Sequence, residues 1–254
     1  MPVIMPRVTV SAMNSCARNL SFHSECVICP CVPFHFCKLS TMKTIYLLLL
    51  SFVLLHSSFA QDLHPAADAT GFVPLFNGRD LTGWKTTGNW LVEPDGSVSL
   101  HPREGEKGWQ RYDAYIATEK QYADFTLDLE FKINAKGNSG VFMRVGNIKE
   151  PVKTGFEVQI LDTYGLEKPG HHDCGGIVKG IGPSKNMVKP AGEWNRYSIT
   201  VKGRSVKVIF NGEQIIDTSL DDITMKDRPN AGNIAFQDEA LPVWYRNVRI
   251  KELK

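Results

Sequence analysis

The chain has 254 residues, with 29 basic and 27 acidic side chains. Four basic residues and one acidic residue lie before residue 61, so residues 61–254 carry 25 basic and 26 acidic side chains. This near-neutral balance gives no electrostatic reason to expect a nucleic acid or an anionic membrane as a partner.

Residues 42–61 read MKTIYLLLLSFVLLHSSFAQ, with one lysine, an apolar run over 45–55, and small residues at Ser58 and Ala60. This order is typical of a secretory signal peptide. The alternative is a transmembrane anchor, but the run is too short to span a bilayer stably. We therefore predict a signal peptide at Met42–Ala60, a secreted or periplasmic location, and no stable membrane anchor after cleavage.

Residues 1–41 are rich in Cys, Pro and aromatic residues without periodicity, and we expect them to be an upstream extension, with synthesis starting at Met42. Five of the six cysteines lie in this segment. Cys26 and Cys29 have the spacing of half a zinc site, but no second half follows. Only Cys174 lies after residue 60, so no intrachain disulfide is expected.

Residues 61–70 form a short polar leader, and from Phe72 the chain reads as strands and turns. Residues 123–133 alternate apolar and polar side chains, as a half-buried strand does. Asn211-Gly212 is a strong hairpin signal. Further strands are expected at 89–93, 97–100, 114–118, 139–145, 174–178, 194–202, 204–210, 232–237 and 243–253. No segment of ten residues has a helical apolar period, so we predict one all-β domain over 71–254.

The segment TGFEVQILDTYG, residues 154–165, places Phe156, Val158 and Ile160 on one face of a strand and Glu157 and Gln159 on the other. Two apolar residues in succession, Ile160 and Leu161, predict a β-bulge that returns Asp162 to the polar face. The polar face could be the floor of a saccharide groove. The alternative is an ordinary solvated strand face.

The spacing of Glu157, Gln159 and Asp162 is similar to the E-x-D-x-x-E pattern of retaining jelly-roll glucanases, with an amide in the middle and a shorter last carboxylate. Residues 157 and 162 would lie roughly 13 Å apart along the strand. A retaining pair needs carboxyl groups about 5–5.5 Å apart. A retaining glycosidase is therefore the runner-up, in which Glu239 could serve as the second carboxylate.

Six motifs occur in order along the chain and resemble the family of 3-keto-disaccharide hydrolases, also described as 3-keto-glucoside lyase/hydratases. They lie at 71–84, 123–144, 155–162, 189–203, 208–212 and 232–253. The resemblance implies a concanavalin A-like, two-sheet jelly-roll sandwich. It also implies action on glycosides oxidised to a ketone at C3. Such a ketone acidifies the C2 proton, so a base can remove it and expel the C1 substituent; water then adds back, giving net hydrolysis.

The resemblance assigns Glu157 as a base or substrate ligand, with Gln159 and Asp162 binding hydroxyl groups or orienting Glu157. It places Asn138 and Arg144 in the same groove, where Arg144 could polarise the ketone oxygen. Gln237 and Arg246 lie in the closing strands. A structural role, as a turn amide or a salt-bridged arginine, is the alternative for these last four residues.

Two positions depart from the family pattern: Glu239 stands where the family has histidine, and Val178 where it has an aromatic residue. The Glu239 replacement transfers the acid/base role of the histidine to a carboxylate, or removes that role. The second removes a ring that could stack on a sugar, so substrate preference could differ. His171–Cys174 offers metal-ligand types, but we favour a loop lining the site, with His172 as a substrate ligand.

The expected partner is a small saccharide, and the sequence does not specify an oligomeric state. No organic cofactor is expected, and a divalent metal is left open. A non-catalytic carbohydrate-binding module is the third hypothesis, because a fold does not specify its chemistry.

Overall fold

A computed structural model describes residues 62–108 and 111–254. The expected upstream extension, the signal peptide Met42–Ala60 and the five cysteines that precede it lie outside these residues. Within the described part of the chain, no helix is long and apolar enough to cross a membrane.

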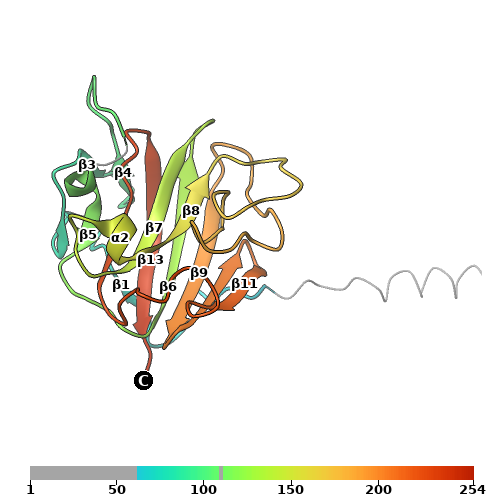
Figure 1. Ribbon diagram of the computed structural model, residues 1–254. Coiled ribbons are helices and arrows are strands. Elements are labelled where there is room, and N and C mark those ends of the chain that lie inside the picture. The colour runs from blue at the N-terminus through green and yellow to red at the C-terminus, as the bar shows by residue number, and fades with distance from the viewer. Residues whose placement is uncertain (1–61, 109–110) are drawn as a thin grey trace, which may run out of the picture. The chain divides into compact units, whose positions relative to one another are not determined.

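Two antiparallel β-sheets pack face to face and enclose one large hydrophobic core (Figure 1). The larger sheet has the order β11-β10-β9-β6-β13-β4-β3, with β1 paired to β13. Its strands are β1 (Val73–Pro74), β3 (Trp90–Val92), β4 (Val98–Leu100), β6 (Phe125–Ile133), β9 (Asn195–Lys202), β10 (Ser205–Phe210), β11 (Glu213–Ser219) and β13 (Val243–Glu252).

The smaller sheet has the order β2-β5-β12-β7-β8. Its strands are β2 (Trp84–Lys85), β5 (Ile116–Thr118), β7 (Asn138–Val145), β8 (Phe156–Leu161) and β12 (Asn233–Phe236). Among the described residues the helical elements are one 3₁₀ turn, η1 (Tyr112–Ala114), and one short helix, α2 (Pro151–Thr154). The predicted all-β, two-sheet jelly-roll sandwich is thus confirmed.

Local sequence signals explain most of these elements. In β6 the five apolar residues from Phe125 to Ile133 are buried in the core, as their alternation predicts. Asn211 and Gly212 join β10 to β11 with φ values of 48° and 89°, the left-handed pair that a type I′ hairpin requires. The strand expected at 174–178 does not form; Ile177 makes only isolated bridges, to Val158 and Ile181.

The alternation in β8 holds, but the predicted bulge is wrong. Strands β7 and β8 pair without a register shift from Asn138 opposite Leu161 to Met143 opposite Phe156. Glu157 and Gln159 therefore point away from the core while their neighbours point into it. Asp162 follows the end of the strand, so no bulge returns it to their face.

The bulge lies instead in β7, at Arg144. The pairing of β7 with β12 shifts register there, and Arg144 has a φ of 50°, in the left-handed region. Its fully buried side chain donates from Nε to the Ala123 carbonyl at 2.8 Å and from Nη1 to the Gly203 carbonyl at 2.6 Å. Nη2 meets Asp124 Oδ1 at 2.8 Å. Arg144 thus connects the smaller sheet to turns of the larger sheet and does not lie in the groove where the sequence placed it.

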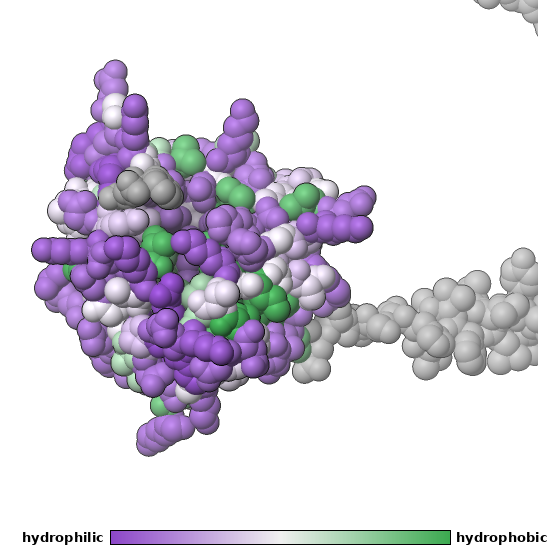
Figure 2. Space-filling view, viewed as in Figure 1, coloured by the Kyte–Doolittle hydropathy of each residue, from purple (hydrophilic) through white to green (hydrophobic). Residues whose placement is uncertain are grey.

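The face of the domain seen in Figure 1 is mostly hydrophilic, and its hydrophobic residues gather in small separate patches (Figure 2). Large hydrophobic side chains with substantial exposure are few among the described residues and come from different segments: Leu63, Val73, Leu91, Ile148, Tyr164, Leu166, Ile181 and Leu241. The described residues thus offer no broad apolar surface to a partner.

Replacing Arg144 with Met should destabilise the domain by about 3 kcal/mol, because the hydrogen bonds of the buried guanidinium group to Ala123, Gly203 and Asp124 are lost. In thermal unfolding this corresponds to a fall in Tm of roughly 6–12 °C. As a control, Lys207→Met removes an exposed ion pair to Asp217 and should change Tm by less than about 2 °C. Equal Tm values for both variants would show that Arg144 does not hold the sheets together.

Candidate active site

Glu157 lies on the outer face of the smaller sheet, yet it is only 7% exposed. The backbone of β8 is covered at its free edge, because Gln159 and Val178 donate to the carbonyl groups of Gly176 and Glu157. The Glu157 carboxyl oxygen Oε1 is buried and has no hydrogen-bond partner. A buried acceptor without a donor costs free energy, so its retention marks a group that a ligand can satisfy.

A glycine on the neighbouring strand makes room for this carboxyl group. Gly140 in β7 lies beside Gln159 of β8, and its backbone oxygen accepts a hydrogen bond from the Gln237 amide nitrogen at 3.0 Å. A Cβ atom at residue 140 would lie 2.0 Å from Glu157 Oε1. The side chain of Glu157 therefore lies across β7, over a position where no other residue type fits without displacing it.

Burial and the charge of a second carboxylate both favour the protonated form of Glu157. Burial is the main cause that raises the pKa of Glu157 from 4.5 to about 8; the charge of Glu239 adds to it, and Lys179 opposes it. Burial also raises the pKa of Glu239 to about 6, with a further contribution from Asp238. The two carboxyl groups thus titrate above the usual range, where an acid/base catalyst is effective near neutral pH.

More unpartnered polar atoms surround this pair. The Tyr115 hydroxyl group lies near Gln237 without forming a well-aligned hydrogen bond, and burial raises its pKa, with Glu157 and Glu239 adding to the shift. Four more buried atoms of site residues or their neighbours lack a hydrogen-bond partner: Asn138 Oδ1, Gln237 Oε1, Asp238 Oδ2 and Arg111 Nη1. Such a concentration of unused donors and acceptors is what a polar ligand needs.

The fully buried Asp238 and the half-buried Glu239 are held by the loop that follows β12. Asp238 Oδ1 accepts a hydrogen bond from the Ala240 amide at 2.7 Å and lies 3.8 Å from Arg111 Nη1. A Cβ atom at Gly108 would lie 2.1 Å from the Glu239 carbonyl oxygen, so the 101–108 segment packs directly on this loop. Two connections far apart in sequence therefore close around the carboxylates.

Other residues predicted for the site have different positions. Asp162 Oδ2 accepts from the Lys136 amide at 2.8 Å and its own amide donates to Gly137, so it holds the β6–β7 turn. Gln159 is buried, and its Oε1 accepts from the Ile160 amide at 2.9 Å. His172 is exposed in a loop and packs edgewise on His171. Of these three, Gln159 alone lies on the face of Glu157.

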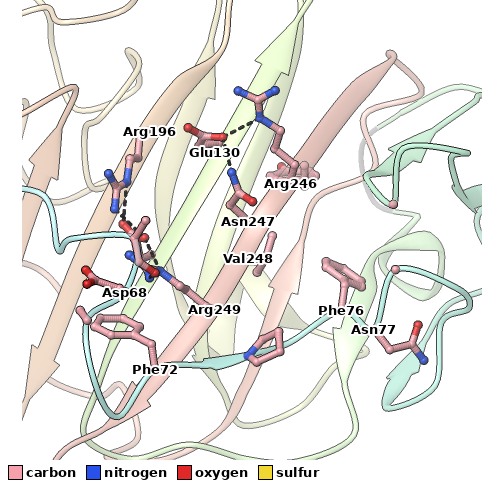
Figure 3. A pocket seen from close by; sticks show the side chains of 17 residues that line it. Asp68, Phe72, Phe76, Asn77, Glu130, Arg196, Arg246, Asn247, Val248 and Arg249 are labelled. Atoms are coloured by element: carbon pink, nitrogen blue, oxygen red, sulfur yellow. Dashed lines mark hydrogen bonds and ion pairs between the residues drawn. The ribbon is translucent and has the colours of Figure 1, made fainter.

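Arg246 lies on the other sheet, in a cavity separate from the Glu157 face. That cavity, of about 740 Å³, opens on the outer face of the larger sheet between β13 and the 67–78 segment (Figure 3). Arg246 donates to Glu130 at 2.6 Å and stacks on the Trp194 ring at 4.1 Å. Buried Asp128 accepts from both Arg196 and Arg249. These charged groups already pair with one another. The cavity therefore offers a ligand fewer free hydrogen-bonding groups than the Glu157 face does.

Sequence reasoning missed Tyr115, Phe142 and Lys179 as neighbours of Glu157, and Arg111 as a neighbour of Asp238. Tyr115 and Phe142 are buried on the outer face of the sheet, where their ring centroids lie 5.6 Å apart. Phe142 pairs directly with Glu157 across the strands. The available signal was the uninterrupted apolar runs at 114–117 and 141–143, which indicate strand segments buried on both faces.

No group of three or more His, Cys, Asp or Glu side chains is close enough to hold a metal ion within residues 62–108 and 111–254. The ligand types of His171–Cys174 do not converge, since Cys174 is buried while both histidines are exposed. The Glu157 face itself presents carboxyl, hydroxyl and amide groups.

Comparison with known proteins adds independent information. The family model described as "3-keto-alpha-glucoside-1,2-lyase-like domain" matches residues 71–251. A 3-keto-disaccharide hydrolase of Bacteroides thetaiotaomicron is 24% identical over 232 residues, which cover 73% of this chain and 80% of the relative.

Two solved structures of provisionally assigned glycosyl hydrolases from Parabacteroides distasonis are also similar, each with a TM-score of 0.61. They are 28% and 27% identical to this chain. Each covers 72% of this chain, and the match spans 94% and 99% of their own chains.

The raised pKa of Glu157 predicts that stability falls with rising pH. The folded state keeps a proton that the unfolded chain releases above pH 4.5, so folding stability is lost progressively between pH 4.5 and about 8. Glu157→Gln should therefore leave Tm little changed at pH 4.5 and raise Tm at pH 9. The corresponding gain in the free energy of unfolding at pH 9 is at most about 5 kcal/mol.

The matched control is Glu150→Gln, at the residue that precedes α2, where the side chain is 44% exposed. It should give the same Tm difference at both pH values. Thermal unfolding followed by circular dichroism measures all three proteins. A Tm gain for Glu157→Gln that does not grow with pH would contradict a raised pKa.

Proposed function

Since this chain belongs to the family of the 3-keto-alpha-glucoside-1,2-lyase-like domain, we propose that it cleaves 3-keto-glycosides, beginning with removal of the C2 proton. The observation that carries the proposal is the Glu157 carboxyl group, buried without a partner over Gly140 and with a pKa of about 8. A carboxylate of that basicity is a stronger base than an ordinary one, and it is partly ionised at neutral pH.

In the proposed reaction Glu157 takes the C2 proton and the electron pair moves into the enolate of the C3 ketone. Tyr115 is a suitable donor to the enolate oxygen, because its hydroxyl group is buried and unpartnered beside Gln237. Tyr115 thus takes the role that the sequence gave to Arg144.

Collapse of the enolate restores the ketone, forms the C1–C2 double bond and expels the glycosidic oxygen. Glu239, with a pKa of about 6, supplies the proton that this oxygen takes. It stands where the family resemblance expects histidine, a residue that also titrates near neutral pH. Water then adds to C1 while a proton returns to C2, which completes net hydrolysis.

The test is release of the C1 substituent from a 3-keto-glucoside and from the unoxidised glucoside, using the wild-type protein, Glu157→Gln and Glu150→Gln. We expect turnover of the keto substrate alone, a loss of roughly 10²–10⁴-fold in kcat for Glu157→Gln, and none for Glu150→Gln. Cleavage of the unoxidised glucoside would indicate a retaining glycosidase with Glu239 as its second carboxylate. Binding of either sugar without cleavage would indicate a carbohydrate-binding module.

A second pair of variants tests the position of the carboxyl group. Gly140→Ala should displace Glu157 and lower kcat at least about 10²-fold, because misplacement of a catalytic group by about 1 Å has that effect. Gly146→Ala, just beyond β7, meets only ordinary contacts and should retain activity. Full activity of Gly140→Ala would exclude Glu157 as the base.

We also propose that the protein acts outside the cytoplasm, on the basis of the signal-peptide pattern at Met42–Ala60. N-terminal sequencing of the protein from its native host should begin at Gln61. A native protein that retains Met42 would contradict cleavage.

A further inference from the structure

A second, smaller cavity lies beside the carboxylates on the outer face of the smaller sheet. Its volume is about 230 Å³. The walls are mostly apolar and come from η1, β5, β7, β12 and the segment leading into α2: Tyr112, Tyr115, Ala117, Val145, Ile148, Pro151 and Ala235. Ile148, at 40% exposure, is the most solvent-accessible of these.

Two hydroxyl groups at the rim of this cavity are already used, and its two lysines, Lys85 and Lys149, are exposed to solvent. The Thr86 hydroxyl donates to the Ala114 carbonyl at 2.9 Å, and the Thr87 hydroxyl donates to Asp113 Oδ2 at 3.1 Å. A second sugar ring would bring several hydroxyl groups that need partners in this space. An apolar ring needs none, so the cavity fits an apolar ring better than a sugar.

Tyr115 connects the cavity to the carboxylates. Its ring forms part of the cavity wall, and its hydroxyl group lies on the side of Gln237, Glu157 and Glu239. Phe142, in contact with that ring, pairs across the strands with Glu157. A glycoside whose sugar contacts Glu157 would therefore have its C1 substituent next to this cavity.

We propose that the cavity binds the aglycone of the substrate and that this aglycone is a single apolar six-membered ring, aromatic or alicyclic. This inference rests on the proposed function, since it assigns the part of the substrate that leaves. The size agrees: a cavity of about 150 Å³ holds benzene, so one of about 230 Å³ holds a substituted ring.

The test compares three 3-keto-glucosides that share one sugar: the methyl glycoside, the cyclohexyl glycoside and a disaccharide. Methanol and cyclohexanol are leaving alcohols of similar acidity, so the difference in kcat/KM between their glycosides reports binding of the ring. We expect the cyclohexyl glycoside to exceed the methyl glycoside by about 10- to 100-fold, from burial of the apolar ring. The disaccharide should fall below the cyclohexyl glycoside.

Ile148→Asp should lower that ratio to about one, because a carboxylate on the cavity wall opposes burial of an apolar ring. Leu166→Asp is the matched control, because Leu166 is equally exposed, at 41%, and does not line the cavity. Faster cleavage of the disaccharide, or a ratio that Ile148→Asp leaves unchanged, would overturn the proposal.

Titration with cyclohexanol, followed by NMR, separates this proposal from the proposed function. If cyclohexanol binds the wild-type protein and Leu166→Asp but not Ile148→Asp, the cavity takes an apolar ring even where no 3-keto-glucoside is cleaved. If the methyl glycoside is cleaved while cyclohexanol does not bind, the proposed function stands and the aglycone assignment fails.

Discussion

The burial of the Glu157 carboxyl group on the outer face of a sheet is the constraint around which the candidate site is organised. A carboxylate at that depth loses hydration, so its pKa rises, and a second carboxylate nearby raises it further. The fold accommodates the group by omitting a side chain at Gly140, and the 101–108 segment packs on the loop that carries Glu239. The chemistry proposed for the site follows from this loss of hydration, because the same burial makes Glu157 a base suited to neutral pH.

The larger sheet supports the site from behind, through the core. The Tyr197 hydroxyl donates to the Gln159 carbonyl at 2.7 Å, and the Ser139 hydroxyl donates to the Gln237 carbonyl at 2.8 Å while meeting the Tyr245 hydroxyl at 2.9 Å. Buried hydroxyl groups need such partners, so they fix the strands to one relative position. The backbone that carries Gln159 and Gln237 is thereby held by the opposite sheet as well as by its own neighbours.

The two faces of the sandwich differ in how they treat charge. On the larger sheet, arginines pair with Asp128 and Glu130, so the large cavity there is lined by groups that already have partners. On the smaller sheet, carboxyl, hydroxyl and amide groups lie buried without partners. Cavity size alone would favour the larger sheet as the place where a ligand binds. Unused hydrogen-bonding capacity favours the smaller sheet as the place where a polar ligand binds.

The sequence by itself determined the sandwich, the hairpin at Asn211-Gly212 and the outward direction of Glu157 and Gln159, because strand alternation and turn chemistry are local properties. It also pointed to Glu239, through a motif position. Only the tertiary structure decided that the bulge lies at Arg144 and not at Leu161, and that Asp162 and Arg246 serve other contacts. It alone joined Tyr115 to Glu157. Side-chain partners of this kind depend on which strands become neighbours, and that pairing is fixed by long-range contacts that no local pattern contains.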